Sequence, residues 1–208
     1  VSNYFHQELR LNCSSYSFKS PLDVWYKGTS KDIWRCLGPI WRGINNMKKV
    51  MVEGKEELRG GQLSEASYLS AFRLGTYIAT QFKPNVAKTI YQLTNAKRVL
   101  DTSCGWGDRL AGFFASDAEE YIGCDPNPNT WRKYQEQIKV YNSFLTKPKK
   151  VKIYNCGAED LPWSEIDNID CSFTSPPYFS TEEYNKGGEM EENQSWFKFN
   201  EYERWRDD

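Results

Sequence analysis

Residues 98–115 read RVLDTSCGWGDRLAGFFA, an apolar strand-like run followed by a glycine-containing turn and a helical pattern. The same alternation of patterns continues as far as residue 174. The spacing of apolar residues predicts strands at 98–101, 121–124, 151–155 and 169–174, and helices at 85–93, 107–115 and 130–144. Parallel neighbouring strands need a crossover, which is usually a helix. The pattern therefore predicts an open, doubly wound parallel sheet of the α/β class.

The first eighty residues lack this alternation and combine many aromatic residues with glycine and proline. The run SPLD at 20–23 is typical of a helix start with proline in its first turn. The charged segment 48–59 fits a solvated helix, and the apolar spacing within 64–80 predicts an amphipathic helix. We therefore expect a basic, aromatic-rich, mainly helical region at 1–80 and an α/β domain at 81–208.

Composition narrows the classes of function. The chain has 208 residues, of which 39% are hydrophobic and 26% charged, enough for a packed core. It has no apolar run long enough for a membrane helix, and residues 1–20 show no signal-peptide pattern. We therefore expect an intracellular protein, located in the cytoplasm or nucleoid of a cell that a phage could also have infected. The single histidine, His6, and six cysteines without a C-x-x-C pair argue against metal sites, disulfides and Ser-His-Asp catalysis.

Charge is divided unevenly along the chain. Residues 1–95 hold 13 Lys and Arg against 7 Asp and Glu, a net charge of +6, whereas residues 96–208 hold 14 against 21, a net charge of −7. A basic half suits contact with a polyanion such as nucleic acid. The same asymmetry can equally hold two lobes of one protein together.

Ligands of open α/β sheets bind at the carboxyl ends of the strands, so the residues that follow each strand are the candidates for function. The first strand ends in DTSCGWG at 101–107. Gly105 and Gly107 let the backbone turn sharply and approach a ligand, and Asp101 can receive a cationic amine. The turn lacks the third glycine of the dinucleotide fingerprint and the G-K-S/T of a phosphate loop. A tight turn without a ligand is the alternative interpretation.

Polar or rigid residues follow the other predicted strands. Asp125 ends the second strand, where it is placed to accept hydrogen bonds from ribose hydroxyls or serves only as a turn former. The third strand is followed by CGAEDL at 156–161 and the fourth by SPPYF at 175–179. The two prolines fix the backbone and leave the carbonyls of Ser175 and Pro176 free to accept hydrogen bonds. A rigid acceptor pair beside an aromatic ring suits a flat ring that bears an amino group.

Together these motifs resemble the S-adenosylmethionine-dependent amino-methyltransferases of DNA, which methylate the exocyclic amine of adenine or cytosine. Their (Asp/Asn/Ser)-Pro-Pro-(Tyr/Phe/Trp) motif is SPPY at 175–178 here, and their D-x-F-x-G-x-G motif matches 101–107 except that Ser103 replaces the usual Phe. FKP at 82–84 is similar to the segment that lies under the methionine part of their cofactor. The resemblance covers about residues 82–205. It implies a Rossmann-like class I methyltransferase fold, with S-adenosylmethionine as cofactor and S-adenosylhomocysteine as product.

The resemblance also implies roles for individual residues. Asp101 and the glycine turn would hold the methionyl end of the cofactor, and Asp125 its ribose. Gly157 takes the place where the family often has an acid that contacts the adenine, so Glu159 or Asp160 would substitute. The residues expected to bind the cofactor are Phe82, Lys83, Pro84, Asp101, Ser103, Cys104, Gly105, Gly107, Asp125, Pro126, Ala158, Glu159, Asp160 and Ser175.

The catalytic residues that the resemblance implies are Ser175, Pro176, Pro177 and Tyr178. The Ser175 side chain and the Pro176 carbonyl would accept the two hydrogens of the target amine, so that its lone pair attacks the methyl group in line. Tyr178 would stack on the base, which must be flipped out of a duplex or supplied single-stranded. None of the nine prolines precedes a cysteine, which argues against methylation of a ring carbon.

Several alternatives stay open from the sequence. The target base is adenine or cytosine, and the expected partner is DNA, with RNA less expected. The same chemistry on RNA or on a protein amide, and a catalytically silent fragment that binds only cofactor or nucleic acid, are the other hypotheses. Because the family sheet has seven strands, we expect the domain to be incomplete at its C-terminus. Residues 180–194 predict a loop, over the substrate or simply solvated, and residues 200–208 predict a helix.

Overall fold

The computed structural model describes residues 2–15, 18–36, 48–59, 73, 75–179, 183–184, 191–199 and 201–207. The chain divides into two compact units. The larger comprises residues 1–10 and 80–208, and the smaller comprises residues 11–79.

The N-terminal helix α1 (Asn3–Leu11) lies almost entirely in the larger unit, whereas the sequence placed the first eighty residues in one region. Its buried residues are Phe5 and His6. The Phe5 ring packs on that of Tyr141 with centroids 5.7 Å apart, and the His6 ring on that of Tyr134 at 5.0 Å. Local sequence patterns do not reveal this packing because the partners lie far along the chain.

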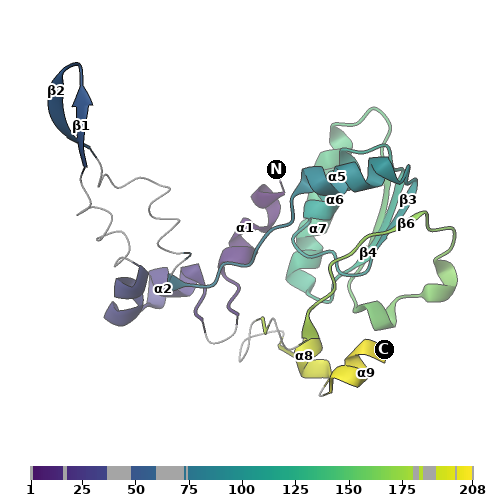
Figure 1. The fold of residues 1–208 in the computed structure, drawn as a ribbon. Coiled ribbons are helices and arrows are strands. Elements are labelled where there is room, and N and C mark those ends of the chain that lie inside the picture. Colours follow the sequence, from purple (N-terminus) through teal and green to yellow (C-terminus); the bar gives the residue numbers. More distant parts are fainter. Residues whose placement is uncertain are drawn as a thin grey trace. The chain divides into compact units, whose positions relative to one another are not determined.

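A parallel sheet forms the centre of the larger unit (Figure 1). Its four strands are β3 (Arg98–Asp101), β4 (Glu120–Cys124), β5 (Lys150–Tyr154) and β6 (Cys171–Ser172). Their order is β5-β4-β3-β6, so the chain first moves away from β3 on one side and then returns to its other side. This is the order of the first four strands of a Rossmann-type sheet. The predicted open parallel α/β sheet is confirmed.

Three helices cover one side of this sheet, namely α5 (Pro84–Leu93), α6 (Asp108–Phe114) and α7 (Pro128–Ser143) (Figure 1). Both α5 and α7 begin at a proline, one and two residues before the predicted starts, because proline suits the first turn of a helix. Helices α5 and α6 pack closely at Gly112, where a Cβ would lie 2.6 Å from the Cβ of Ala87.

The core between these helices and the sheet draws buried residues from every element. At its centre the fully buried Phe113 packs on Tyr121 with ring centroids 5.3 Å apart. Each large apolar side chain buried here stabilises the fold by about 1.5–3 kcal/mol. This packing holds the strands in register and so fixes where their carboxyl ends lie. The main core residues are Ala87, Tyr91, Val99, Leu110, Phe113, Tyr121, Tyr134, Ile153 and Cys171.

Strand β6 is shorter than the predicted strand at 169–174. The side chain of Asp170 accepts the backbone N–H groups of Lys97 at 2.9 Å and Arg98 at 2.7 Å. The backbone N–H of Asp170 also donates to the Arg98 carbonyl at 3.0 Å, and that of Phe173 to the Leu100 carbonyl at 2.9 Å, so backbone bonds to β3 continue on both sides of this short strand.

Short helices follow the third and fourth strands. The 3₁₀ helices η1 (Ala158–Asp160) and η2 (Trp163–Glu165) lie between β5 and β6. After β6 come η4 (Glu191–Asn193), α8 (Ser195–Lys198) and α9 (Tyr202–Asp207), and α9 corresponds to the helix predicted at 200–208. Most of the predicted loop at 180–194 lies outside the described residues.

The smaller unit contains helix α2 (Pro21–Lys27), which confirms the helix start predicted at 20–23. Ser20 caps this helix, because its hydroxyl oxygen accepts the backbone N–H of Asp23 at 3.1 Å. Residues 30–36 are also helical. The amphipathic helix predicted at 64–80 falls largely outside the described residues, and residues 77–80 are not helical.

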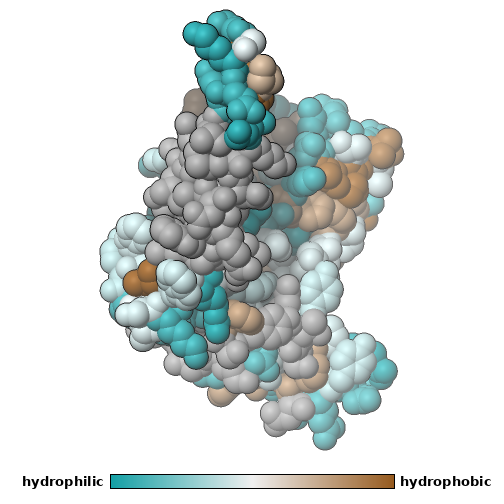
Figure 2. Space-filling model, turned by 60° about the vertical axis from the view of Figure 1, so that its left-hand side comes forward, coloured by the Kyte–Doolittle hydropathy of each residue, from teal (hydrophilic) through white to brown (hydrophobic). Residues whose placement is uncertain are grey.

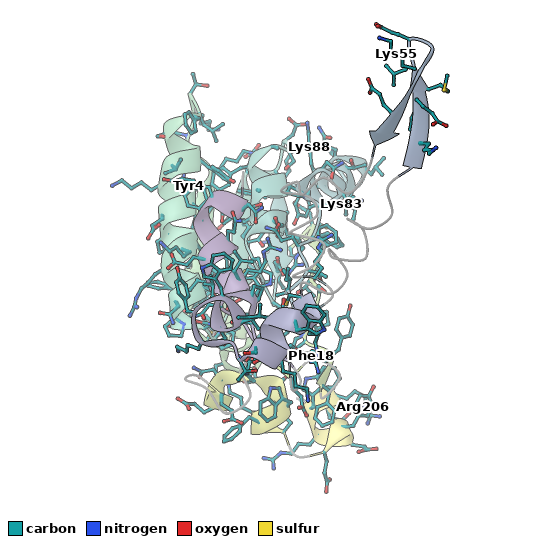
Figure 3. The ribbon with its side chains drawn as sticks, turned by 90° about the vertical axis from the view of Figure 1, so that its left-hand side faces the viewer. Tyr4, Phe18, Lys55, Lys83, Lys88 and Arg206 are labelled. Carbon is teal, nitrogen blue, oxygen red and sulfur yellow. The ribbon has the colours of Figure 1, made fainter. Side chains whose placement is uncertain are left out.

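The helix suggested for residues 48–59 is wrong, because this segment forms an antiparallel hairpin. Strands β1 (Lys48–Val52) and β2 (Lys55–Arg59) are joined by Glu53 and Gly54, with φ of 49° and 78°. Two successive positive φ values define a tight turn whose twist matches that of the strands. Figure 2 shows the hairpin at the top of the view as mainly hydrophilic, and Figure 3 marks its Lys55. The many charged residues of this segment indicated exposure to solvent, and both an exposed helix and an exposed hairpin satisfy that.

Candidate functional site

Two of the loops singled out in the sequence begin at neighbouring strand ends. Strands β3 and β6 are parallel, with Val99 opposite Cys171 and Leu100 opposite Ser172. The glycine turn at 101–107 and the SPPY loop at 175–178 therefore leave the same edge of the sheet. The strand order reverses between these two strands, and this switch point is where open α/β sheets bind ligands.

Asp101, at the end of β3, is fully buried and paired with a cation of the same chain. Arg109 donates from Nε to Oδ2 at 2.8 Å and from Nη2 to Oδ1 at 3.2 Å. The Tyr121 hydroxyl and the Ser103 N–H also donate to this carboxylate. Four donors occupy the acceptor positions of Asp101. The cation that the sequence suggested would come from a ligand is supplied by Arg109, which sequence reasoning missed.

The two glycines of the turn have left-handed φ values, 62° at Gly105 and 73° at Gly107, but different surroundings. A Cβ on Gly107 would lie 2.3 Å from Gln137 Oε1 and 2.7 Å from His6 Nε2, so tight packing excludes a side chain there. The nearest atom to a Cβ on Gly105 would be Arg109 Nη2, at 3.8 Å. The backbone at Gly105 therefore has open space beside it that a ligand can approach.

Cys104 supports the glycine turn from the core. Its thiol is buried, and a Cβ on Gly123 would lie 2.4 Å from its Sγ. Its backbone N–H donates to the Cys124 carbonyl at 3.0 Å, which ties the turn to the end of β4. Burial raises the pKa of the Cys104 thiol well above its ordinary value, so this group stays neutral.

Asp125 follows β4 and lies beside the glycine turn. Its carboxylate receives the N–H of Gly105, the N–H of Asn127 at 3.0 Å and the hydroxyl of Tyr134 at 2.9 Å. Withdrawal from water raises the pKa of Asp125 to about 7, although these hydrogen bonds oppose the rise. The side chain and the adjoining Pro126 are nevertheless partly exposed. Asp125 therefore combines an approachable carboxyl group with a pKa near neutrality.

Helix α7 contacts both glycines of the turn. The Tyr134 hydroxyl donates to the Gly105 carbonyl, and Gln137 Nε2 donates to the Gly107 carbonyl at 2.8 Å. Tyr134 and Gln137 are both fully buried and lie three positions apart, so they share one face of the helix. Sequence reasoning missed both residues, because nothing in the helical pattern separates them from ordinary core positions.

His6 supports Gln137 from helix α1. Its Nε2 lies 3.0 Å from Gln137 Oε1. Since an amide oxygen only accepts, this contact assigns the ring proton to Nε2. Burial lowers the pKa of His6 to about 4, so the ring is neutral. The histidine that the sequence set aside as terminal therefore belongs to the surroundings of the glycine turn.

The segment 82–84 lies near both strand ends. The Phe82 ring contacts that of Phe173, just after β6, with centroids 5.6 Å apart, and Arg109 lies 5.8 Å from its centroid. Lys83 is exposed and precedes the half-buried Pro84 at the start of α5; Figure 3 marks Lys83. Within the predicted cofactor segment 82–84, the ring of Phe82 therefore contacts Phe173 beyond β6 and Arg109, the partner of Asp101.

Glu159, in η1, folds back over Gly157. A Cβ on Gly157 would lie 2.2 Å from Glu159 Oε2, so this carboxylate occupies the space of a side chain at position 157. Lys198 of α8 donates to Glu159 at 2.6 Å. Partial burial opposes the charged form, but the hydrogen bonds and charge that favour it outweigh burial and lower the pKa of Glu159. Ala158 and Asp160 lie on either side in the same 3₁₀ turn.

The SPPY loop follows β6 and has no regular secondary structure. Ser175 is half-buried, whereas Pro176, Pro177 and Tyr178 are exposed, and Tyr178 has 56% of its surface accessible. The following residue, Phe179, has a positive φ of 47°. Its ring packs against Tyr202 at 5.9 Å and Trp205 at 5.8 Å between centroids. Helix α9 thus contacts the end of the loop that carries the predicted catalytic residues.

No group of three or more His, Cys, Asp or Glu side chains is placed to hold a metal ion in the described part of the chain. Among the helices described, none combines the length and apolar character needed to cross a membrane.

Comparison with known proteins assigns no function to this chain. No protein-family model matches the chain, and no curated protein matches it. Among solved structures, the crystal structure of the N-terminal domain of EvdMO1 with SAH bound is similar, with 16% sequence identity and a TM-score of 0.38. The match covers 69% of this chain and 52% of the other, so the chain spans about half the length of that protein. Functional proposals therefore depend on this chain's own residues.

Proposed function

We propose that this chain is an S-adenosylmethionine-dependent methyltransferase that acts on the exocyclic amino group of adenine or cytosine in DNA. The observation that carries this assignment is the placement of the glycine turn and the SPPY loop at the ends of the neighbouring strands β3 and β6. A cofactor site and an amine-accepting loop must lie next to each other for direct transfer between two bound molecules.

The residues around the glycine turn fit most of this cofactor. The open space at Gly105 admits a ligand to the backbone, and the partly exposed Asp125 carboxylate can accept hydrogen bonds from ribose hydroxyls. Asp101 is saturated by Arg109, Tyr121 and Ser103, so the methionyl amine would have to bind backbone carbonyls of the turn. When bound, S-adenosylmethionine supplies an electrophilic methyl group.

Glu159 would contact the adenine ring of the cofactor. Its carboxylate occupies the space of a side chain at Gly157, the position where the resembling family often has an acid. An ionised carboxylate can accept a hydrogen bond from an exocyclic amine, and Lys198 helps to keep Glu159 ionised.

The SPPY loop provides the acceptors for the target amine. The Ser175 side chain and the Pro176 carbonyl would each accept one N–H, which would turn the nitrogen lone pair out of conjugation and toward the methyl group. The N–C bond would form as the S–C bond breaks and S-adenosylhomocysteine leaves, and the methylated amine would release one proton to water. The exposed ring of Tyr178 is available to stack on the base. Since an amine within a duplex is enclosed by the base stack, the base would be flipped out or supplied single-stranded.

Contact with nucleic acid is supported by the exposed surface of residues 18–36 in the smaller unit. Tryptophan and tyrosine rings there are accessible, 67% for Trp25, 76% for Tyr26 and 66% for Trp34. The basic residues of this segment outnumber its acids, and Asp32 is already paired with Lys19 at 2.7 Å. Accessible aromatic rings among cations suit base stacking and phosphate contact.

The test is transfer of labelled methyl groups from S-adenosylmethionine to duplex DNA, single-stranded DNA, RNA and protein. We expect incorporation into DNA, with loss of about 100-fold or more in kcat for Ser175→Ala, because an acceptor aligned with the reacting amine is removed. Tyr4→Phe is the matched control, since Tyr4 on α1 is 85% exposed (Figure 3).

Other outcomes would change the assignment. Labelling of RNA or protein but not DNA would replace the substrate and keep the chemistry. Binding of S-adenosylhomocysteine without transfer to any substrate would identify a catalytically silent domain. Full activity of Ser175→Ala would contradict the role given to the SPPY loop.

Contact with DNA is tested separately by the affinity of the complete chain for single-stranded oligonucleotides. Trp34→Ala should weaken binding by about 1–3 kcal/mol if this ring stacks on a base. Trp163→Ala is the control, because Trp163 is also exposed but lies in η2 of the larger unit. Equal affinities for both variants would argue against this surface as the DNA contact.

A further inference from the structure

Tyr134 and Gln137 are buried polar residues of helix α7 that the proposed reaction does not use. Tyr134 and Gln137 are each 0% exposed and face the glycine turn. Burying polar groups is unfavourable unless every one is hydrogen-bonded. Both side chains make their bonds to the two glycine carbonyls of the turn. An ordinary core helix would place apolar residues at these positions.

Tyr134 joins the two parts of the site that are expected to hold the cofactor. Its hydroxyl oxygen lies within hydrogen-bond reach of the Gly105 carbonyl and 2.9 Å from Asp125 Oδ2. A hydroxyl has one proton, so Tyr134 shares its donor between these two acceptors. One side chain therefore holds the Asp125 carboxyl group beside the Gly105 carbonyl, in addition to the backbone bond from Cys104 to Cys124 that ties the turn to the end of β4.

Gln137 holds the second glycine of the turn and is itself held. Its Nε2 donates to the Gly107 carbonyl at 2.8 Å, while its Oε1 accepts from His6 Nε2 at 3.0 Å. The Gly107 carbonyl fixes which way the amide faces, because an amide turned over would put its oxygen against that carbonyl, and Oε1 is then left to accept from His6. Helix α1 thus acts on the glycine turn through Gln137.

We infer that Tyr134 and Gln137 are positioning residues of the cofactor site: Tyr134 fixes Asp125 relative to Gly105, and Gln137, held by His6, fixes Gly107. This role rests on the proposed function, because it presumes that S-adenosylmethionine binds at this turn. Neither side chain touches the cofactor, so each acts through the backbone or through Asp125.

The two residues differ in their effect on the protonation of Asp125, which makes the role testable. Of these two residues, Tyr134 donates a hydrogen bond to Asp125 and Gln137 does not. The bond favours the ionised carboxylate and so lowers the pKa of Asp125, which burial has raised to about 7. Among the described residues, the other titratable groups near Asp125 are Asp101, which is paired with Arg109, and the thiols of Cys104 and Cys124, whose raised pKa values keep them neutral. His6, with a pKa of about 4, does not titrate near pH 7.

The sign of the pH effect follows from the ribose contact. Two ribose hydroxyls donate best to an ionised carboxylate, so affinity should be high above the pKa of Asp125 and fall as the pH decreases through about 7. Removing the Tyr134 hydroxyl takes away one donor to the carboxylate. The pKa of Asp125 then rises, and the midpoint of the affinity profile moves to higher pH.

The experiment is calorimetric titration of the complete chain with S-adenosylhomocysteine between pH 5.5 and 8.5. We expect Tyr134→Phe to weaken binding roughly tenfold at pH 8, the equivalent of one hydrogen bond, and to shift the midpoint upward. Gln137→Leu should weaken binding by a similar factor with an unchanged midpoint. Tyr91→Phe is the control, because Tyr91 is equally buried and its hydroxyl has no hydrogen-bond partner among the described residues.

Each result separates the role of α7 from the cofactor assignment. Wild-type binding with an unshifted midpoint in Tyr134→Phe would contradict the role of Tyr134 and leave the proposed function intact. Equal losses in Tyr91→Phe would show that any buried hydroxyl has this effect, which also contradicts it. If the folded wild type binds no S-adenosylhomocysteine at any pH, the proposed function fails, and the role of α7 fails with it.

Discussion

Asp101 and Arg109 show how a single pair changes the interpretation of a motif. The aspartate that opens the glycine motif is 0% exposed, and Arg109, 5% exposed, supplies its positive charge from the first turns of α6. A buried carboxylate requires such a partner, because an isolated charge in a low-dielectric core is strongly unfavourable. This pair therefore holds the turn in place whether or not a ligand is bound.

We predict that Arg109→Leu lowers the free energy of unfolding by about 3–5 kcal/mol, since it leaves the Asp101 charge buried and uncompensated. Urea unfolding followed by circular dichroism measures the change. Lys133→Ala is the control: it breaks an exposed pair with Glu136, 3.0 Å long, and should change stability by less than about 1 kcal/mol. Equal effects of the two substitutions would contradict the structural role of Arg109.

The two glycines of the turn should respond differently to alanine. Gly105→Ala introduces left-handed strain of roughly 1–2 kcal/mol but meets open space. Gly107→Ala adds a clash with Gln137 and His6, which should cost a further 1–3 kcal/mol or so. Thermal unfolding ranks the two variants, and a less stable Gly105→Ala would reverse the expected order. Cofactor affinity should fall in Gly105→Ala even though the fold is kept.

Among single helices and strands, the starts of the helices were predicted well from the sequence. Helix α2 begins where the run SPLD predicted. The Ser20 side chain accepts a backbone N–H of the first turn, and Pro21 has no N–H that would need an acceptor there. The hairpin β1–β2 was less readable. Its turn at Glu53-Gly54 is a strong local signal, but Val50, Met51 and Val52 are consecutive and β2 is mostly charged, so neither strand shows a clear alternation of apolar and polar residues.

The cap of α2 can be tested alone. Ser20→Ala should destabilise this helix by about 1 kcal/mol, because the N–H of Asp23 loses its acceptor. Faster hydrogen exchange of the α2 amides would report the loss without requiring the whole chain to unfold. Ser30→Ala, at an exposed position, should leave these amides unchanged. Unchanged exchange in Ser20→Ala would show that packing alone holds the helix.

At the scale of the whole molecule, the first ten residues belong to the unit that contains the parallel sheet. Their contact is aromatic, between the Phe5 ring and Tyr141 and between the His6 ring and Tyr134. Because α7 also holds the glycine turn, the N-terminus is linked to the candidate site through one helix.

We predict that Phe5→Ala destabilises the larger unit by about 3–5 kcal/mol, the usual loss for a buried aromatic side chain. Tyr4→Ala, which removes a neighbouring but 85% exposed ring, should cost no more than about 0.5 kcal/mol. Hydrogen exchange of the amides in α6 and α7 measures both. Equal protection in the two variants would show that α1 does not stabilise this unit.

Local sequence patterns were enough to predict the elements of the α/β unit and its two motif loops. Strand β3 was placed at its observed bounds, and the neighbouring helices and strands β4 and β5 within two residues, because periodicity and proline or glycine signals act locally along the chain. The candidate residues of both loops were read from the same local patterns.

Only the tertiary structure decided which residues meet. Strand order placed β6 beside β3, so the SPPY loop and the glycine turn share one edge of the sheet. Packing brought Arg109 to Asp101, and Tyr134, Gln137 and His6 to the glycine turn. Such pairings depend on burial between segments distant in the chain, where each polar group must find a partner. A sequence pattern predicts which face of a helix or strand is apolar. It does not predict which polar side chains of other segments will form hydrogen bonds at that face.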